Sequence, residues 1–130
     1  KIGKGNCLKS GTKTAVLSTG TIGNNVTDAL AECANADTIA HYDFPFIKPL
    51  DIDTLKEICN SHEQLITIED GSVLGGFGST IATFMSIHYT GLSVKILGIP
   101  DEFIEHGTVI EQQRKCKIDV NSLVNIFSSY

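Results

Sequence analysis

The sequence holds 130 residues, of which 42% are hydrophobic and 19% are charged, and its formal net charge is −5 at pH 7. Such a chain is long enough to bury its own hydrophobic core, so we expect one domain over residues 1–130. Arg114 is the only arginine, which argues against a nucleic-acid-binding face. No apolar run reaches the roughly 20 residues that span a bilayer, so we expect no membrane association.

Neither the N-terminal lysines nor the cysteines of the chain have the pattern of a binding site. The lysines alternate with glycine and serine and predict a solvated N-terminal segment: Lys1, Lys4, Lys9 and Lys13. The cysteines lack the close spacing of a zinc clip: Cys7, Cys33, Cys59 and Cys116. We therefore expect reduced thiols in a cytoplasmic protein, with Cys33 and Cys59 on the apolar faces of helices.

The first half of the chain predicts two strands and two helices. Residues 14–19 are a short apolar run that ends at a glycine and predict a buried strand. Apolar residues then recur at helical spacing over residues 22–35. Residues 38–43 predict the second strand, and Asp51 is a good N-cap for the helix after it.

The second half continues the alternation. Residues 64–69 and 93–98 predict two further strands. Between them, a glycine-rich loop leads into a helix with four inward side chains: Ile81, Ala82, Phe84 and Met85. Thr108 and Glu111 have the spacing of a capping box that opens a short polar helix. A final helix carries Leu123, Val124, Ile126 and Phe127.

The alternation of strands and helices predicts an α/β fold. Consecutive parallel strands joined by right-handed crossovers place helices on both faces of the sheet. We therefore expect a three-layer α/β/α sandwich with a mostly parallel sheet.

Two glycine-rich turns are candidate ligand sites. Gly20 and Gly23 keep part of the dinucleotide-binding spacing, and Asp43 ends the second strand, but the third glycine is missing and a tight turn is favoured. The loop over residues 71–78 has no Gly-Lys-Ser/Thr and is no P-loop. Its helix N-terminus favours an anion, yet acidic residues flank it.

Those acidic residues are Glu69 and Asp70. They are suited to binding a cation or to pairing with a basic group of a neighbouring chain. The favoured interpretation is that Asp70 begins a turn and that Glu69 is a solvated strand end. The adjacent glycines Gly75 and Gly76 indicate a close approach of backbone to another group.

The histidines have no metal-binding spacing. We expect His41 in the core or on a sheet face, His62 and His88 at helix ends, and His106 in a loop, where it is the best polar candidate. No Gly-x-Ser-x-Gly elbow is present, so no nucleophile is identified.

Several segments together resemble a known family. Phe46-Ile-Lys-Pro-Leu-Asp51, Ile66-Thr-Ile-Glu-Asp-Gly71, Gly75-Gly-Phe-Gly-Ser79, Gly98-Ile-Pro-Asp101 and Glu105-His-Gly-Thr108 occur in an order and at a spacing similar to those of the C-terminal domain of 1-deoxy-D-xylulose-5-phosphate synthases. These enzymes belong to the transketolase-like, thiamine-diphosphate-dependent family. The resemblance covers the chain from about Gly3 to its last residue.

The resemblance implies a domain excised from a longer transferase. Such a parent condenses pyruvate with glyceraldehyde 3-phosphate for isoprenoid and thiamine synthesis, uses thiamine diphosphate and magnesium, and is a cytoplasmic homodimer. Its preceding domains supply the cofactor site, so no catalytic, cofactor or metal residue is expected in this chain, and the isolated domain is expected to be inactive. The partners implied are the preceding domains and a second parent chain.

Candidate interdomain or dimer contacts follow from the resembling segments: Asp43, Lys48, Glu69, Asp70, Gly75, Gly76, Gly78, Asp101 and His106. Two positions depart from the family, because Pro45 and Glu102 stand where relatives usually have arginine. An arginine at position 45 can pair with a carboxylate such as Glu69, so the partner of the acidic pair stays open and the parent is either a standard synthase or a divergent paralogue.

Three alternatives remain on sequence grounds. The chain is the C-terminal domain of another transketolase-like enzyme (transketolase itself or a pyruvate-type dehydrogenase beta subunit), a free-standing interaction module, or a small ligand-binding domain that uses the Gly20 turn.

Overall fold

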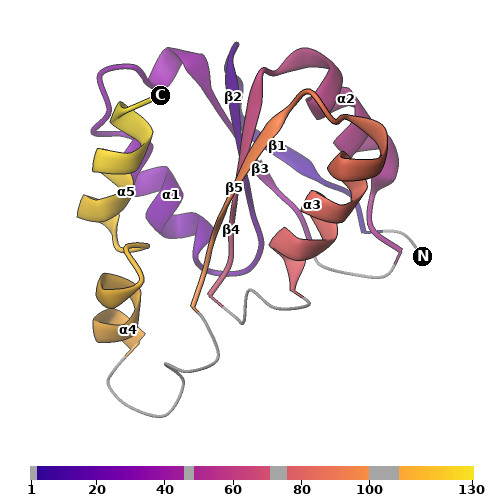
Figure 1. Cartoon of the computed structure of the whole chain (residues 1–130). Coiled ribbons are helices and arrows are strands. Elements are labelled where there is room, and N and C mark those ends of the chain that lie inside the picture. The colour runs from indigo at the N-terminus through magenta and orange to yellow at the C-terminus, as the bar shows by residue number, and fades with distance from the viewer. Residues whose placement is uncertain (1–2, 46–48, 71–75, 100–108) are drawn as a thin grey trace.

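A computed structural model of the chain describes residues 3–45, 49–70, 76–99 and 109–130. These residues contain a five-stranded sheet in the order β1-β3-β2-β4-β5 with helices on both faces (Figure 1). The strands are β1 (Asn6–Lys9), β2 (Thr14–Ser18), β3 (Ile39–Asp43), β4 (Gln64–Ile68) and β5 (Ser93–Leu97). The helices are α1 (Gly23–Leu30), the 3-10 turn η1 (Ala36–Thr38), α2 (Ile52–Ser61), α3 (Phe77–His88), α4 (Val109–Lys115) and α5 (Val120–Ser128).

The predicted three-layer α/β/α sandwich is confirmed. Strand β2 pairs in parallel with both β3 and β4, and β4 pairs in parallel with β5. All five residues of β2 are buried, since it is central in the sheet and is covered on both faces. Among the described residues, no helix is long and apolar enough to cross a bilayer.

Successive side chains along each strand point to opposite faces of the sheet, so the fold has two hydrophobic cores, one on each face. Val16 and Ile66 face α1 and α5, whereas Ala15, Leu17 and Leu65 face α2 and α3. The first core is completed from the helices mainly by Val26, Ala29, Leu123 and Phe127. The second is completed mainly by Leu55, Ile58, Phe77 and Ile81. Most of the apolar side chains predicted to face inward are buried in these two cores. Ile52 and Ala34, which were predicted on the inward faces of their helices, are exposed instead.

The solvated N-terminal segment predicted from the lysines is wrong in part, because it contains β1. This strand pairs antiparallel with the outer edge of β3, with Asn6 opposite Asp43. Within it, the Lys9 ammonium donates to the carbonyl oxygens of Ile39 at 2.8 Å and of Ser10 at 3.2 Å, and also to that of Ala36. Carbonyl groups at the start of β3 therefore hold a lysine that the sequence pattern assigned to solvent.

Helix α1 is shorter than the predicted range of residues 22–35. It ends at Leu30, and η1 forms before β3. After Leu30 the backbone continues in tighter turns, in which Cys33 N donates to Leu30 O at 3.3 Å. The side-chain amide of Asn35 then donates to the carbonyl oxygen of Phe127 at 3.0 Å and ties this segment to α5. Asparagine favours such turns over helix interiors. Cys33 and Cys59 are buried, as predicted from the apolar faces.

Asp51 is the predicted N-cap of α2. Its carboxylate accepts hydrogen bonds from the backbone N–H of Thr54 at 3.2 Å, the Thr54 hydroxyl at 2.6 Å and the backbone N–H of Gly5 at 3.0 Å. Burial by itself raises the pKa of Asp51, but the Thr54 side chain, these N–H groups and the charge of Lys4 outweigh burial and leave the pKa below its ordinary value. The predicted cap of α4, Thr108, lies outside the described residues.

Gly78 allows α3 to approach the sheet closely. A Cβ atom at this position would lie 2.7 Å from Thr67 Oγ1 and 2.7 Å from Ile96 Cγ2. Thr67 is fully buried in β4, so there is no free space into which it can move. The spacing between α3 and the two strands β4 and β5 therefore requires glycine at this point.

We expect the Gly78→Ala substitution to lower the free energy of unfolding by about 1–3 kcal/mol. Overpacking against Thr67 and Ile96 outweighs the roughly 1 kcal/mol by which alanine favours a helix. Gly91→Ala is the matched control, because a Cβ at Gly91 meets nothing within 4 Å. Urea unfolding monitored by circular dichroism measures both variants, and equal stability of the two would contradict this account.

Candidate functional site at the carboxyl edge of the sheet

The candidate residues that the structure describes lie where the parallel strands end, at the lower edge of the sheet in Figure 1. Backbone hydrogen bonds extend the pairing past the strand ends, from Phe44 N to Ser18 O at 2.8 Å and from Thr19 N to Ile68 O at 3.3 Å. In open α/β sheets this edge is where ligands and partners bind.

Glu69 caps helix α3. Only 6% of the residue is exposed. Its Oε1 accepts the backbone N–H of Phe77 at 3.1 Å, and its Oε2 accepts that of Gly78 at 2.7 Å. The favoured prediction of a solvated strand end is therefore wrong for Glu69. The carboxylate is bound by the positive end of a helix of its own chain.

The Glu69 contact also bears on whether the helix that follows the glycine loop can bind an anion. A helix N-terminus with free N–H groups attracts an anion, but here the carboxylate of Glu69 occupies that position. The Glu69 contact supplies a partner that the sequence left open, and it requires no arginine at position 45. Gly76 precedes α3 in an extended conformation with φ −90° and ψ −164°. Gly76 is the N-cap of α3, and Gly78 lies in the first turn of the helix, where its N–H reaches Glu69.

Asp70 and Asp43 lie on either side of the turn that follows β2. Asp70 is exposed, and its Oδ1 lies 4.0 Å from the position of a Cβ at Gly20, which has φ 81°. Asp43 is half-buried at the end of β3, opposite Asn6 and Ser18. No ion pair to either carboxylate is found within the described ranges. Both residues therefore stay candidates for the contacts that the sequence predicts.

The remaining predicted contacts lie outside the described residues. They are Lys48, Gly75, Asp101 and His106, together with the departing position Glu102. Within the described ranges, no group of three or more histidine, cysteine, aspartate or glutamate side chains is placed to hold a metal ion.

One contact was missed by the sequence analysis. Ser18 Oγ lies 2.7 Å from His41 Nε2, and both residues are buried beneath the start of α1. The N-terminus of the helix is close, since a Cβ at Gly23 would lie 2.9 Å from Ser18 Oγ. A signal existed, because Ser18 and His41 face the same side of neighbouring parallel strands.

The Ser18–His41 pair is structural in its present form. A nucleophilic serine needs a base that a third group orients and an exposed hydroxyl. Ser18 is fully buried, and within the described ranges no carboxylate contacts His41. Burial lowers the pKa of His41 to about 4, so the imidazole is neutral at neutral pH. The prediction that His41 is a core or sheet-face residue is confirmed.

The other two described histidines end helices, as predicted. His62 is buried after α2, with Nδ1 3.0 Å from Ile58 O and its ring edge-on to Tyr42. His88 is exposed at the last position of α3.

Comparison with known proteins identifies relatives of the whole chain. Residues 3–123 match the family described as "Transketolase, C-terminal domain". The chain is 45% identical over 124 residues to 1-deoxy-D-xylulose-5-phosphate synthase of Bacteroides thetaiotaomicron. This match covers 94% of the present chain and 19% of the relative. It is 43% identical over 123 residues to the synthase of the same name from Parabacteroides distasonis, covering 94% of this chain and 20% of the relative.

A solved structure shares the fold. The protein described as "Split gene transketolase, inactive beta4 tetramer" matches with a TM-score of 0.82 and 26% identity, covering 97% of this chain and 41% of its own. The resemblance seen in the sequence motifs is confirmed. The chain spans about a fifth of the length of the curated relatives that it matches.

We expect Glu69→Ala to lower the free energy of unfolding by about 2–3 kcal/mol, because it removes the acceptor oxygens from the N–H groups of Phe77 and Gly78 in a buried place. Glu69→Gln keeps one acceptor oxygen and should cost about half as much. Glu63→Ala, at an exposed glutamate before β4, is the control. Chemical unfolding of the three variants gives the comparison, and a Glu69→Ala protein as stable as Glu63→Ala would refute the cap.

The buried His41 should make the fold sensitive to acid. Its folded pKa is about 4, whereas the ordinary value is 6.5, so the unfolded chain binds a proton first as the pH falls. Stability contributed by the neutral ring is thus present above pH 6.5 and declines towards pH 4, by up to about 1.4 kcal/mol per pH unit.

Urea unfolding between pH 7 and pH 4 tests this expectation. His41→Gln should show a shallower loss of stability with acid than the unsubstituted chain, and His88→Gln, at an exposed position, should not. Parallel pH profiles for all three proteins would show that His41 does not carry the effect.

Proposed function

The chain belongs to the transketolase C-terminal domain family, and on that premise we propose that it is the C-terminal domain of a 1-deoxy-D-xylulose-5-phosphate synthase whose carboxyl edge packs against the preceding domains. The parent enzyme condenses pyruvate with glyceraldehyde 3-phosphate for isoprenoid and thiamine precursor synthesis. Identities of 45% and 43% to two synthases, against 26% to a transketolase structure, favour the synthase over other members of the family.

The position of β1 is the observation that supports the interdomain role. Because β1 is antiparallel to β3, its first residue, Asn6, lies opposite Asp43, at the carboxyl edge. Any chain that precedes β1 therefore arrives at that edge. The backbone N–H of Gly5 is also fixed there by Asp51. In this proposal the preceding domains join the chain close to Asp43, at the edge of the sheet that also carries Asp70.

The described residues do not fit the thiamine diphosphate and magnesium that the family implies. A diphosphate needs free N–H donors or basic groups, but the N-terminus of α3 is capped by Glu69. The exposed carboxylate of Asp70 beside it repels phosphate. Within the described ranges, no cluster of candidate ligands is placed to hold a metal ion. The cofactor and magnesium belong to the preceding domains in this proposal, and the parent is a cytoplasmic homodimer.

The role of this domain is then to cover and position its neighbours. Exposed Asp70 and half-buried Asp43 offer two carboxylates at the edge, which suit basic side chains of a neighbouring domain or of the second parent chain. The isolated domain contributes no catalytic group and is inactive.

The test combines the 130-residue chain with a separately produced protein that holds the preceding domains of the parent. We expect association in sedimentation experiments and synthase activity only in the mixture. Asp70→Arg should weaken the association by about tenfold or more through charge reversal at the contact. Asp37→Arg is the control, because Asp37 is exposed in η1, before β3 and away from the carboxyl edge.

Equal effects of the two reversals would place the contact elsewhere. Calorimetric titration of the chain alone with thiamine diphosphate and magnesium should give no binding heat. Tight binding by the chain alone would contradict the assignment of the cofactor to the preceding domains.

A further inference from the structure

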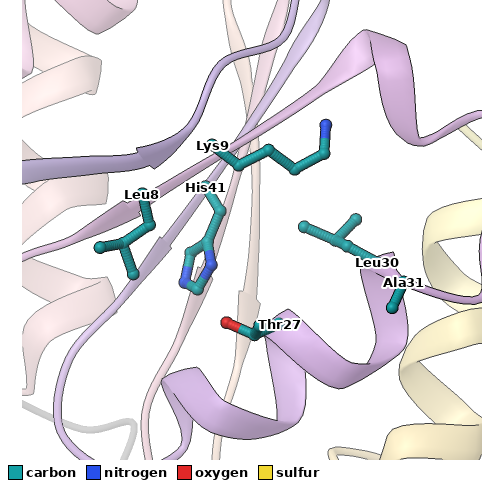
Figure 2. Close-up of a pocket in the computed structure, with 6 residues that line it drawn as sticks. All are labelled: Leu8, Lys9, Thr27, Leu30, Ala31 and His41. Carbon is teal, nitrogen blue, oxygen red and sulfur yellow. The ribbon is translucent and has the colours of Figure 1, made fainter.

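A separate cavity of about 300 Å³ lies between the edge strand β1 and the last turns of α1 (Figure 2). Its lining residues are Leu8, Lys9, Thr27, Leu30, Ala31 and His41. None of these six is acidic, and none is among the interdomain or dimer contacts predicted from the sequence. The size is at the lower end of the range for small-molecule sites.

We assign the proton of the neutral His41 ring from its hydrogen bond to Ser18, because either ring nitrogen can carry it. The Ser18 hydroxyl is fully buried, and its hydrogen bond is to His41 Nε2 at 2.7 Å. A buried hydroxyl proton is satisfied only if it is donated, so Nε2 is the acceptor. The neutral ring then has its proton on Nδ1. Within the described ranges, no protein group accepts that proton.

Lys9 adds a positive charge at the other end of the cavity. In Figure 2 its side chain extends along one side of the space, on the side opposite Thr27. Its ammonium binds the carbonyl oxygens of Ser10, Ala36 and Ile39. Carbonyl oxygens satisfy the N–H donors of an ammonium but do not neutralise its charge, so Lys9 places one positive charge at this end of the cavity.

The walls of the cavity are aliphatic. Leu30 and Ala31 come from α1, and Leu8 lies across from them on β1 with 57% of its surface exposed. Thr27 presents its side chain beside His41, with its hydroxyl donating to Gly23 O at 3.2 Å. A ligand that fills the space therefore needs an apolar part and one acceptor for the imidazole N–H.

We propose that this cavity binds a short aliphatic carboxylate. One carboxylate oxygen accepts the hydrogen bond from His41 Nδ1, the negative charge is favoured by Lys9, and the aliphatic chain packs against Leu30 and Ala31. An acid of about four to six carbons fits a space of this size. The inference stands independently of the interdomain role.

The probe is sodium butanoate, titrated into the isotope-labelled 130-residue chain and followed by amide chemical shifts. We expect saturable shifts at Thr27, Ala31 and His41 with a dissociation constant on the order of 1 mM. Butan-1-ol and butylammonium chloride, at matched ionic strength, should bind about tenfold more weakly, because they lack the carboxylate. Equal binding of the three probes, or no saturation with butanoate, would overturn the proposal.

A pair of variants locates the site. Ala31→Phe fills the cavity from an exposed helix position and should abolish the butanoate shifts. Ala34→Phe adds the same side chain at an exposed position that does not line the cavity, and it should bind butanoate as the unsubstituted chain does. Dispersed amide spectra establish that both variants are folded. Unchanged butanoate binding by Ala31→Phe would place any bound acid elsewhere.

Discussion

One buried carboxylate determines where helix α3 begins. Glu69 follows the last residue of β4, and its two oxygens bind the first two N–H groups of α3. The charge favours the positive end of the helix, and the missing side chain at Gly78 lets the helix lie close enough to β4 for the contact to form. Glu69 thereby joins the residue before the glycine-rich loop to the first residues after it. The glycine-rich segment considered as a candidate ligand site acts in this fold as a strand-to-helix connection.

Local chemistry was predictable and long-range chemistry was not. The four parallel strands and the Asp51 cap follow from apolar runs and from a carboxylate three residues before the N–H that it binds. The Glu69 contact escaped prediction because its partners lie eight and nine residues downstream, across a loop. Strand β1 escaped because its four residues are mostly exposed and show no apolar pattern. Its identity depends on pairing with β3, about thirty residues later.

The fold and the site make different contributions to the functional argument. A three-layer sandwich alone is compatible with many activities, so similarity to the synthases determines which parent is proposed. The geometry supports the proposed position of the contact between this domain and that parent. The start of β1, exposed Asp70 and half-buried Asp43 all lie at one edge of the sheet. At the opposite ends of the strands, Lys9 binds a backbone carbonyl oxygen, that of Ile39.

The antiparallel strand β1 also defines where this domain can be cut. Truncation before β2 would remove Gly5, and with it one hydrogen bond to the Asp51 carboxylate. It would also remove the hydrogen bonds that Lys9 donates to the carbonyl oxygens of Ala36 and Ile39. The outer edge of β3 would be left as an open row of backbone donors and acceptors, which is a template for aggregation. A soluble version of this domain must therefore include the seven residues from 3 to 9, even though they lie outside the parallel sheet.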